Sequence, residues 1–537
     1  MAHGQDLSHR QTELDLRVVD SQGQAVGGAN VDLTMLRHDF RFGTEINSTK
    51  YLTDSTSRFV VSSLFNSVTF TGGLYWRITE ELDGDGVDNY DRLLQATALA
   101  DANNIDVRGH TIIWPQNKGW LNPEDTLPQY TYKPWLGPDP VFNNQYNPSA
   151  QDLQDRISGR IDAVLNSTLP SGNAYGAYIY EFDATNETID QESPPAPGID
   201  AERVDIFSPR LVDAGLYPDR IAAMADWYVQ MDAARPDARL VFNETAILAP
   251  SSDAAAIELR DLVQSLLDAG APIDAIGVQM HMFAGLRSLS DLNRKINILA
   301  ETGLPVEITE FDNFDGGAYN TNSARQSFEN ALRVAFENPN VSGFTLWGFE
   351  DGDHWVGNSP LFDSQLNLKP EGQPYYDLVL GEWWTTLTDQ TTDAQGQTEA
   401  TLTRGTYRLD VEHNGQTITQ EFIVTTATAA LEVDVDAGLA YLLGDMNGDD
   451  TLSIDDALVF ALALGDGAAY QSIYGLDAAQ RGDINGDGQF SLADVQAFAA
   501  FFEPGQADAF FVAIPEPTTA AVLTLLAAGT LGRPRRR

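Results

Sequence analysis

Two short segments of this sequence carry acidic residues at the ends of apolar, β-like runs. Residues 182–187 end in Glu187, and residues 307–312 contain Glu310. Two carboxyl groups that face one glycosidic bond can cleave it, because one protonates the leaving oxygen while the other attacks the anomeric carbon and forms a covalent intermediate. The two glutamates are therefore candidates for such a pair, provided that the fold brings them together.

Eight apolar runs alternate with amphipathic stretches, the pattern of repeated βα units. The runs are residues 40–46, 65–70, 107–114, 178–182, 239–242, 276–280, 305–308 and 343–347. Eight such units predict an α/β fold with a (β/α)8 TIM barrel over residues 39–384, whose active site lies at the C-terminal ends of the strands. Glu187 and Glu310 follow the fourth and seventh runs, so we expect both on that face. The predicted helices are residues 90–102, 150–165, 221–234, 254–268, 289–301 and 323–337.

The composition excludes several classes of function. The 537 residues are 43% hydrophobic and carry a formal charge of −46, which indicates a folded protein with an acidic surface. Such a surface repels phosphate backbones, so no nucleic-acid partner is expected. The chain has no cysteine, which excludes disulfides, thiolate metal sites and cysteine nucleophiles.

Short β-like segments flank the predicted barrel. They include Asp393-Ala394-Gln395-Gly396 and Gly405-Thr406-Tyr407, which resemble the Asp-x-x-Gly and Gly-x-Tyr signatures of transthyretin-like sandwiches. We therefore expect one small β-sandwich that is split around the barrel, and two unrelated β decorations are the alternative. Its two parts would be residues 12–38 and 385–436, with hairpins predicted from residues 14–23 with 28–33 and from 401–411 with 418–424.

Residues 443–503 contain two matched acidic loops. Oxygen ligands at loop positions 1, 3, 5, 7, 9 and 12 wrap a calcium ion, with position 7 supplying its backbone carbonyl. The doubled loop, with Asp at position 12, resembles a type I dockerin, which implies a small α-helical calcium-binding module and a cohesin-like protein partner. The predicted Ca²⁺ ligands are Asp445, Asn447, Asp449, Thr451, Ser453 and Asp456, then Asp483, Asn485, Asp487, Gln489, Ser491 and Asp494.

The end of the sequence, residues 514–537, has a pattern of its own. Pro515-Glu516-Pro517 precedes a short apolar run, and four arginines follow the run. This arrangement resembles a PEP-CTERM sorting tail, which implies export to the extracellular space or cell surface of a bacterium and a transient membrane association. An ordinary hydrophobic C-terminal helix is the alternative.

Polar and aromatic residues gather at the predicted strand ends, in residues 108–111 with Trp114, 183–187, 279–281, 308–312 and 345–348. Together they resemble the pattern of glycoside hydrolase family 10, the endo-β-1,4-xylanases, over roughly residues 40–384. The resemblance implies a retaining endo-β-1,4-glycanase that acts on a β-1,4-linked polysaccharide such as xylan, without a cofactor for catalysis.

Family and chemistry together suggest roles for these residues. Glu187 would be the acid/base and Glu310 the nucleophile, while His281 would hydrogen-bond Glu310 and Asp312 would orient the imidazole. Asn186 is suited to bind a sugar 2-hydroxyl. The remaining substrate-binding candidates are His110 and Gln279 for other hydroxyls, and Trp114, Trp347 and Trp355 as stacking faces for pyranose rings.

One segment departs from the family pattern. After residues 65–70 the family places a Glu-Asn pair and then a Lys, which grip the glycone sugars, but this chain has Thr71, Gly72 and Tyr75 there. Losing hydrogen bonds that strengthen toward the transition state lowers turnover as well as affinity. Two alternatives thus stay open: a carbohydrate-binding or surface-assembly protein with a weakly active or inactive barrel, and a β-glucanase of a related barrel family.

Overall fold

The protein is represented by a computed structural model. It describes residues 6–20, 22, 24–74, 90–115, 149–166, 178–189, 205, 207–282, 286–313, 321–425, 430–435, 446–447, 454–465, 467–474, 478–482, 484, 490–491, 494 and 498. Tyr75 and the predicted sorting tail lie outside these residues. So do eight of the predicted calcium ligands, namely Asp445, Asp449, Thr451, Ser453, Asp483, Asn485, Asp487 and Gln489.

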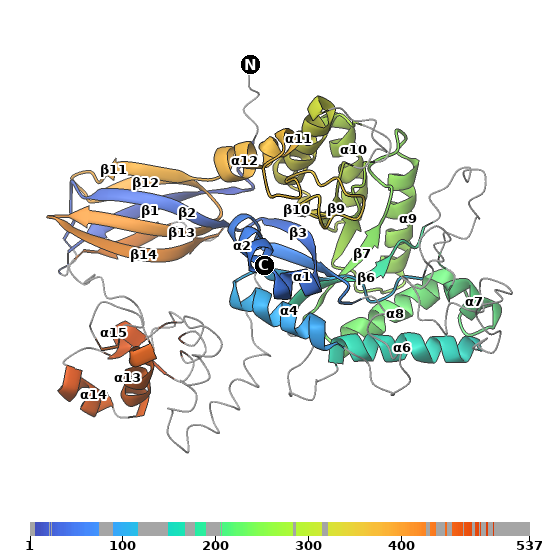
Figure 1. Ribbon diagram of the computed structural model, residues 1–537, viewed down its shortest axis with the longest axis horizontal. Coiled ribbons are helices and arrows are strands. Elements are labelled where there is room, and N and C mark those ends of the chain that lie inside the picture. Colours follow the sequence, from blue (N-terminus) through green and yellow to red (C-terminus); the bar gives the residue numbers. More distant parts are fainter. Residues whose placement is uncertain are drawn as a thin grey trace.

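Eight parallel strands close into a barrel in the order β10-β3-β4-β5-β6-β7-β8-β9, surrounded by helices (Figure 1). The predicted (β/α)8 barrel is therefore confirmed. The strands are β3 (Arg41–Asn47), β4 (Ser67–Thr71), β5 (Asp106–Gly109), β6 (Ile179–Asn186), β7 (Arg239–Glu244), β8 (Ala275–Val278), β9 (Val306–Phe311) and β10 (Val341–Leu346). The helices are α1 (Ser48–Thr53), α2 (Ser55–Leu64), α4 (Asp91–Ala102), α6 (Ala150–Asn166), α7 (Phe207–Asp213), α8 (Arg220–Ala234), α9 (Ala254–Asp268), α10 (Leu289–Ala300), α11 (Thr321–Glu337) and α12 (Gln373–Asp377).

Two barrel strands continue past the apolar runs that predict them. Strand β6 extends beyond Phe182 to Asn186, and β9 extends beyond Ile308 to Phe311. The added residues include polar side chains that lie inside the barrel, and these are paired there rather than exposed to water. Asp183, for example, is fully buried and receives hydrogen bonds from Arg108. Both catalytic candidates thus stand on or directly after a strand, where backbone pairing fixes their positions.

Two further sheets pack face to face beside the barrel (Figure 1). One has the order β12-β1-β15 and the other β11-β2-β13-β14, and a single apolar core fills the space between them. Strands from before and after the barrel thus pair within the same sheets. The strands are β1 (Gln11–Val19), β2 (Asn30–His38), β11 (Thr386–Thr391), β12 (Gln397–Thr403), β13 (Gly405–His413), β14 (Gln416–Val424) and β15 (Ala430–Asp434).

The hairpin predicted from residues 14–23 and 28–33 is wrong. Strand β1 pairs with β12 and β15, whereas β2 pairs with β11 and β13, so the two segments lie in different sheets. Both have the period-2 alternation of half-buried strands, but that alternation does not identify the partner of either strand. The second hairpin does form between β13 and β14, around Asn414 and Gly415, which both have positive φ as a tight two-residue turn requires.

Arg10, directly before β1, connects the sandwich to the barrel. Its Nε donates to the carbonyl oxygen of Phe336 at 2.9 Å, and one Nη donates to the carbonyl oxygens of Asn338 at 3.2 Å and Val341 at 2.5 Å. The guanidinium also lies 4.5 Å from the ring centroid of Phe40. Charge-assisted hydrogen bonds of this kind fix the start of the sandwich against the chain between α11 and β10.

The described part of the C-terminal region contains α13 (Ile454–Gly465), α14 (Gly467–Tyr474) and α15 (Ala478–Gly482). Asp456 and Asp494, the twelfth residues of the two predicted loops, are buried and bind backbone N–H groups of their own loops. Asp456 accepts from Met446 and Asn447, and Asp494 accepts from Ser491. Among the described residues, no helix has the length and apolar character needed to cross a membrane.

Candidate active site

Glu187 directly follows β6 and adopts a left-handed backbone, with φ of 51°. Such a conformation is unfavourable for a residue with a side chain and needs support from its surroundings. Glu244, at the end of β7, supplies part of it: its carboxylate accepts hydrogen bonds from the backbone N–H of Thr188 at 2.7 Å and Ile189 at 3.0 Å. Burial raises the pKa of Glu244 to about 8, although its backbone hydrogen bonds lower it and nearby Glu187 raises it further.

A chain of amide side chains joins Glu187 to Glu310. Gln279 Nε2 donates to Glu187 Oε1 at 3.1 Å and to Asn186 Oδ1 at 3.2 Å. Asn243 Nδ2 donates to the same Asn186 oxygen at 2.8 Å and to Glu310 Oε1 at 3.0 Å. The Nδ2 of Asn186 is buried and has no hydrogen-bond partner among the described residues. Glu187 and Glu310 thus share one network, which retains one unused donor.

His281 connects Glu310 to Asp312. Its Nδ1 donates to Asp312 at 2.7 Å, its Nε2 lies 3.3 Å from Glu310, and Trp355 Nε1 donates to the same Asp312 oxygen at 2.8 Å. Burial disfavours the charged imidazole, but Asp312 and Glu310 outweigh this and raise the pKa of His281 to about 10. Burial would also raise the pKa of Asp312, but His281 lowers it below its usual value. The imidazolium therefore keeps a positive charge beside Glu310 through the neutral range.

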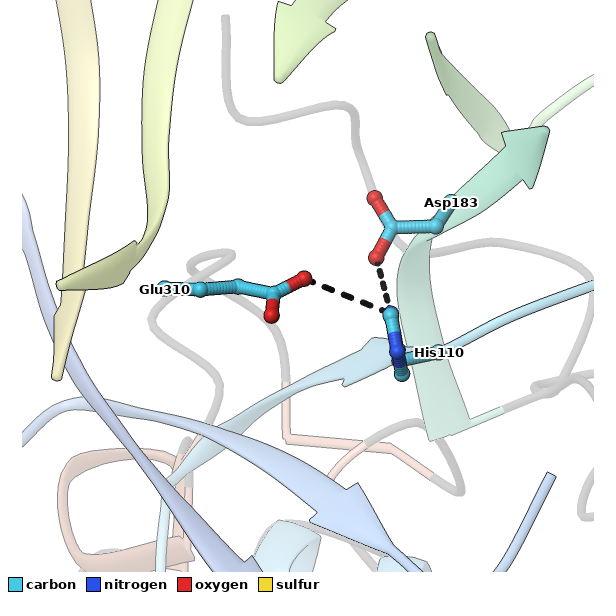
Figure 2. Close-up of side chains that lie close together, drawn as sticks. All are labelled: His110, Asp183 and Glu310. Carbon is cyan, nitrogen blue, oxygen red and sulfur yellow. Dashed lines mark hydrogen bonds and ion pairs between the residues drawn. The ribbon is translucent and has the colours of Figure 1, made fainter. Parts of the chain in front are cut away.

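His110 lies between Asp183 and Glu310 (Figure 2). Its Nδ1 is 2.7 Å from Asp183 Oδ2 and 3.9 Å from Glu310 Oε1, and Arg108 holds the Asp183 carboxylate through two nitrogens. The three acidic or imidazole side chains each offer one ligand atom, all within 4.8 Å of one another, as a metal site would require. However, Arg108 already places a positive charge on Asp183, so the group fits a hydrogen-bonded relay better than a cation site.

Three tryptophans surround these polar groups. Trp347 and Trp114 meet the edge of His110, with ring centroids 5.1 and 5.7 Å away, and Trp355 lies 5.5 Å from His281. Trp347 is buried, Trp114 is half-buried, and Trp355 is 43% exposed. Trp355 therefore offers the largest open aromatic face, while the other two mainly enclose the two histidines.

The structure brings all ten predicted barrel-site residues to one end of the barrel. Gln279 and His110, predicted to bind sugar hydroxyls, also hydrogen-bond other side chains of the protein. Sequence reasoning did not find the bridging role of Asn243 or the support that Glu244 gives Glu187. Their position after the fifth apolar run was the one available signal. The pairing of Arg108 with Asp183 was also missed, although both residues lie in the segments that carry the family resemblance.

The family comparison matches most of the chain. A family model described as "Glycosyl hydrolase family 10" matches residues 33–376. The solved structure of a GH10 protein from Paenibacillus barcinonensis superposes with a TM-score of 0.51 at 22% sequence identity, covering 64% of this chain and 94% of that one. At this identity the likeness supports the barrel fold alone.

Three curated relatives illustrate the breadth of the match. An anti-sigma-I factor of Acetivibrio thermocellus is 25% identical over 412 residues, which are 76% of this chain and 46% of that protein. An endo-1,4-β-xylanase of Paenibacillus barcinonensis is 25% identical over 393 residues (68% and 33%), and an endo-β-1,4-xylanase of Cellvibrio japonicus is 23% identical over 397 residues (67% and 59%). The chain thus spans less than two thirds of the length of each of these relatives.

Proposed function

This chain belongs to glycosyl hydrolase family 10, and we propose that it is a retaining endo-β-1,4-glycanase, specifically an endo-1,4-β-xylanase, that hydrolyses internal bonds of xylan or a related polysaccharide. The observation that carries the proposal is the continuous hydrogen-bond chain from Glu187 through Gln279, Asn186 and Asn243 to Glu310. Two of the curated relatives are named as endo-β-1,4-xylanases, which supports the choice of polymer.

In the first step, Glu310 attacks the anomeric carbon while Glu187 gives its proton to the leaving oxygen, and a glycosyl ester with Glu310 forms. Asn243 and His281 hold one carboxylate oxygen each, so the attacking group is oriented before the substrate arrives. The free Nδ2 of Asn186 is suited to donate to the sugar 2-hydroxyl, a contact that strengthens as the oxocarbenium-like transition state develops.

In the second step, Glu187 removes a proton from water, which attacks the same carbon and releases Glu310. His281 supports this departure as well, because a positive imidazolium stabilises the carboxylate that leaves. The exposed face of Trp355 is available to stack on a pyranose ring, as aromatic side chains commonly do in sites for neutral sugars.

We expect the full chain to release new reducing ends from β-1,4-xylan, and less or none from mixed-linkage glucan and cellulose. Glu310→Ala, measured in parallel, is the control for contaminating activity. Preferential cleavage of a glucose polymer would replace this proposal with the β-glucanase alternative. If the chain binds a polymer without cutting any, it is a carbohydrate-binding or surface-assembly protein, the alternative that the Thr71, Gly72 and Tyr75 departure favours.

We also propose the finer organisation of the chain: a sandwich of residues 12–38 and 385–436 around a barrel of residues 39–384, a dockerin-like module at 443–503, and a sorting tail at 514–537. The doubled acidic loops support calcium binding and a cohesin-like partner, and the Pro-Glu-Pro pattern supports export to a bacterial surface. In each loop, the buried twelfth residue, Asp456 or Asp494, braces backbone of its own loop, which suits a compact ion site.

Calcium is expected to stabilise the dockerin-like module against heat in the full chain. Ion binding to the folded form alone shifts unfolding by mass action, so a low-temperature transition should move upward with Ca²⁺ and return with chelator. Differential scanning calorimetry measures this, with Mg²⁺ as the control ion. Identical profiles with Ca²⁺ and with chelator would exclude the calcium loops.

A further inference from the structure

At the end of β4, where the sequence departs from the family pattern, side chains of a neighbouring strand occupy the space. Thr71 ends β4 and Gly72 follows it, and both are met by longer side chains from the neighbouring strand β3. The Glu45 carboxylate accepts a hydrogen bond from Thr71 Oγ1. A side-chain Cβ at Gly72 would lie only 3.1 Å from Asn47 Nδ2, so the Asn47 amide fills the space that a residue at position 72 would use.

The register of β3 against β4 explains why these side chains meet. Strand β3 runs parallel to β4 with Glu45 opposite Thr69 and Asn47 opposite Thr71. Glu45 and Asn47 are two residues apart, so their side chains leave β3 on the same face. Gly72 has φ of +68°, a conformation that side chains rarely adopt. The short residues on β4 and the long ones on β3 are therefore complementary to each other.

Glu45 lies at the catalytic end of the barrel. Its carboxyl group is close enough to Glu310 for the two to interact electrostatically, and its Oε2 lies 3.5 Å from where a Cβ would stand on Gly348. Gly348 directly follows Trp347, whose ring meets His110. Glu45 therefore borders the same space as Glu310 and Trp347.

The group around Glu45 is suited to neutral hydroxyls rather than to an anion. Burial raises the pKa of Glu45 to about 8, although Thr71 lowers it and Asp353 raises it further, so at neutral pH the carboxyl can donate as well as accept. Lys50 pairs with Glu350 and lies 4.0 Å from Asp353, so its charge is already balanced. A negatively charged sugar would also lie near Asp353 and Glu310, which raise the pKa of Glu45, at an energetic cost.

We propose that Glu45 and Asn47 bind the glycone sugar next to the cleavage point, and that they replace from β3 the Glu-Asn pair that β4 lacks. They select a neutral, hydroxyl-bearing pyranose over a uronic acid or a uronate-substituted ring at that position. This inference rests on the glycanase function proposed above, and it names the residues that determine which sugar that site accepts.

The variants must separate sugar binding from support of the fold. Glu45→Ala removes the carboxyl group. Asn47→Asp keeps the oxygen that caps α1 by accepting from Thr49 N at 2.9 Å, and removes the Nδ2 donor. Glu45→Ala/Thr71→Glu returns a carboxyl group to β4. The matched control is Glu337→Gln at the end of α11, because Glu337 is a glutamate of similar burial to Glu45. The side chain of Glu337 is 8% exposed, and the whole residue Glu45 is 7% exposed.

Two readouts are measured on each variant: kcat/KM for aryl β-xylobiosides, and the Kd for xylotetraose in a Glu310→Ala background. Because each variant removes a hydrogen-bonding group that the sugar would use, we expect Glu45→Ala and Asn47→Asp each to weaken both readouts by roughly 10- to 100-fold. The loss in kcat/KM should be equal for good and poor aryl leaving groups. The Glu45→Ala/Thr71→Glu variant should recover part of it, and Glu337→Gln should match the native protein.

The binding readout keeps this inference separate from the proposed activity. If the native chain binds xylotetraose but cuts nothing, the glycanase function fails while the Kd values still test Glu45 and Asn47. Unchanged Kd and kcat/KM in both single variants would overturn the inference. So would losses that follow only a lowered melting temperature, with no recovery in the double variant.

Discussion

Glu310→Ala is expected to lower kcat on xylan by on the order of 10⁵-fold or more, as removal of a covalent nucleophile does in other enzymes that form covalent intermediates. The fall should be this large because Glu310 forms the new bond to the anomeric carbon in the first step, and Asn243 and His281 hold this carboxylate in position for the attack. Initial rates of reducing-end release measure it, with circular dichroism to show that the variant is folded.

A small anion provides the decisive control for Glu310. In Glu310→Ala, azide can occupy the space of the missing carboxylate and attack an aryl β-xylobioside from the same face, while Glu187 protonates the leaving aryl oxygen. The product is a glycosyl azide of inverted configuration, which NMR identifies. Near-native turnover by Glu310→Ala without azide would mean that another group is the nucleophile.

Glu187→Ala is expected to lower the rate on xylan by about 10²- to 10⁴-fold, the usual contribution of a general acid–base group. The loss should depend on the leaving group. A 2,4-dinitrophenolate leaves without a proton, so formation of the glycosyl ester on a dinitrophenyl xylobioside should change little. A poor leaving group such as phenol should lose most of its rate. A series of aryl xylobiosides, followed by pre-steady-state release of the phenol, measures this dependence.

The second step distinguishes Glu187 from a residue that only supports the fold. Without its base the ester should accumulate, and azide should release it as a glycosyl azide of retained configuration. Glu337→Gln, which lies outside the catalytic network, should show neither effect. An equal loss on all leaving groups, with no response to azide, would contradict the acid/base role of Glu187.

The barrel is predictable from sequence because parallel strands that are buried on both faces are continuous apolar runs, and all eight runs became strands. The limits of β6 and β9 are not predictable in this way. Asp183 in β6 looks like the end of a strand, yet Arg108 on β5 neutralises it inside the barrel, a pairing between strands far apart in the sequence. The predicted hairpin of β1 and β2 is wrong for a related reason, because the alternation of apolar and polar residues identifies a strand but not the strand that pairs with it.

The catalytic residues are likewise only partly predictable. Glu187 and Glu310 follow from chemistry and strand position, because any barrel collects its strand ends at one face. Glu45 could not be found in this way. Within the sequence it is one polar residue in a strand, and its proposed role depends on the short side chain of Thr71 on the neighbouring strand. The departure at Thr71 is visible in the sequence of β4, but only the pairing of the two strands identifies the residue of β3 that meets it.

The sandwich also has a consequence for how the whole chain holds together. Gln11 on β1 pairs with Thr403 on β12, so residues that precede the barrel are hydrogen-bonded in one sheet to residues that follow it. Separating the two ends of the barrel would therefore require breaking the hydrogen bonds of this sheet. A disulfide joins distant points of a chain in the unfolded form as well, whereas strand pairing is lost on unfolding and joins them only in the folded protein. In a chain without cysteine, the sandwich can act as a noncovalent clasp that makes loss of the barrel and loss of the sandwich one cooperative event.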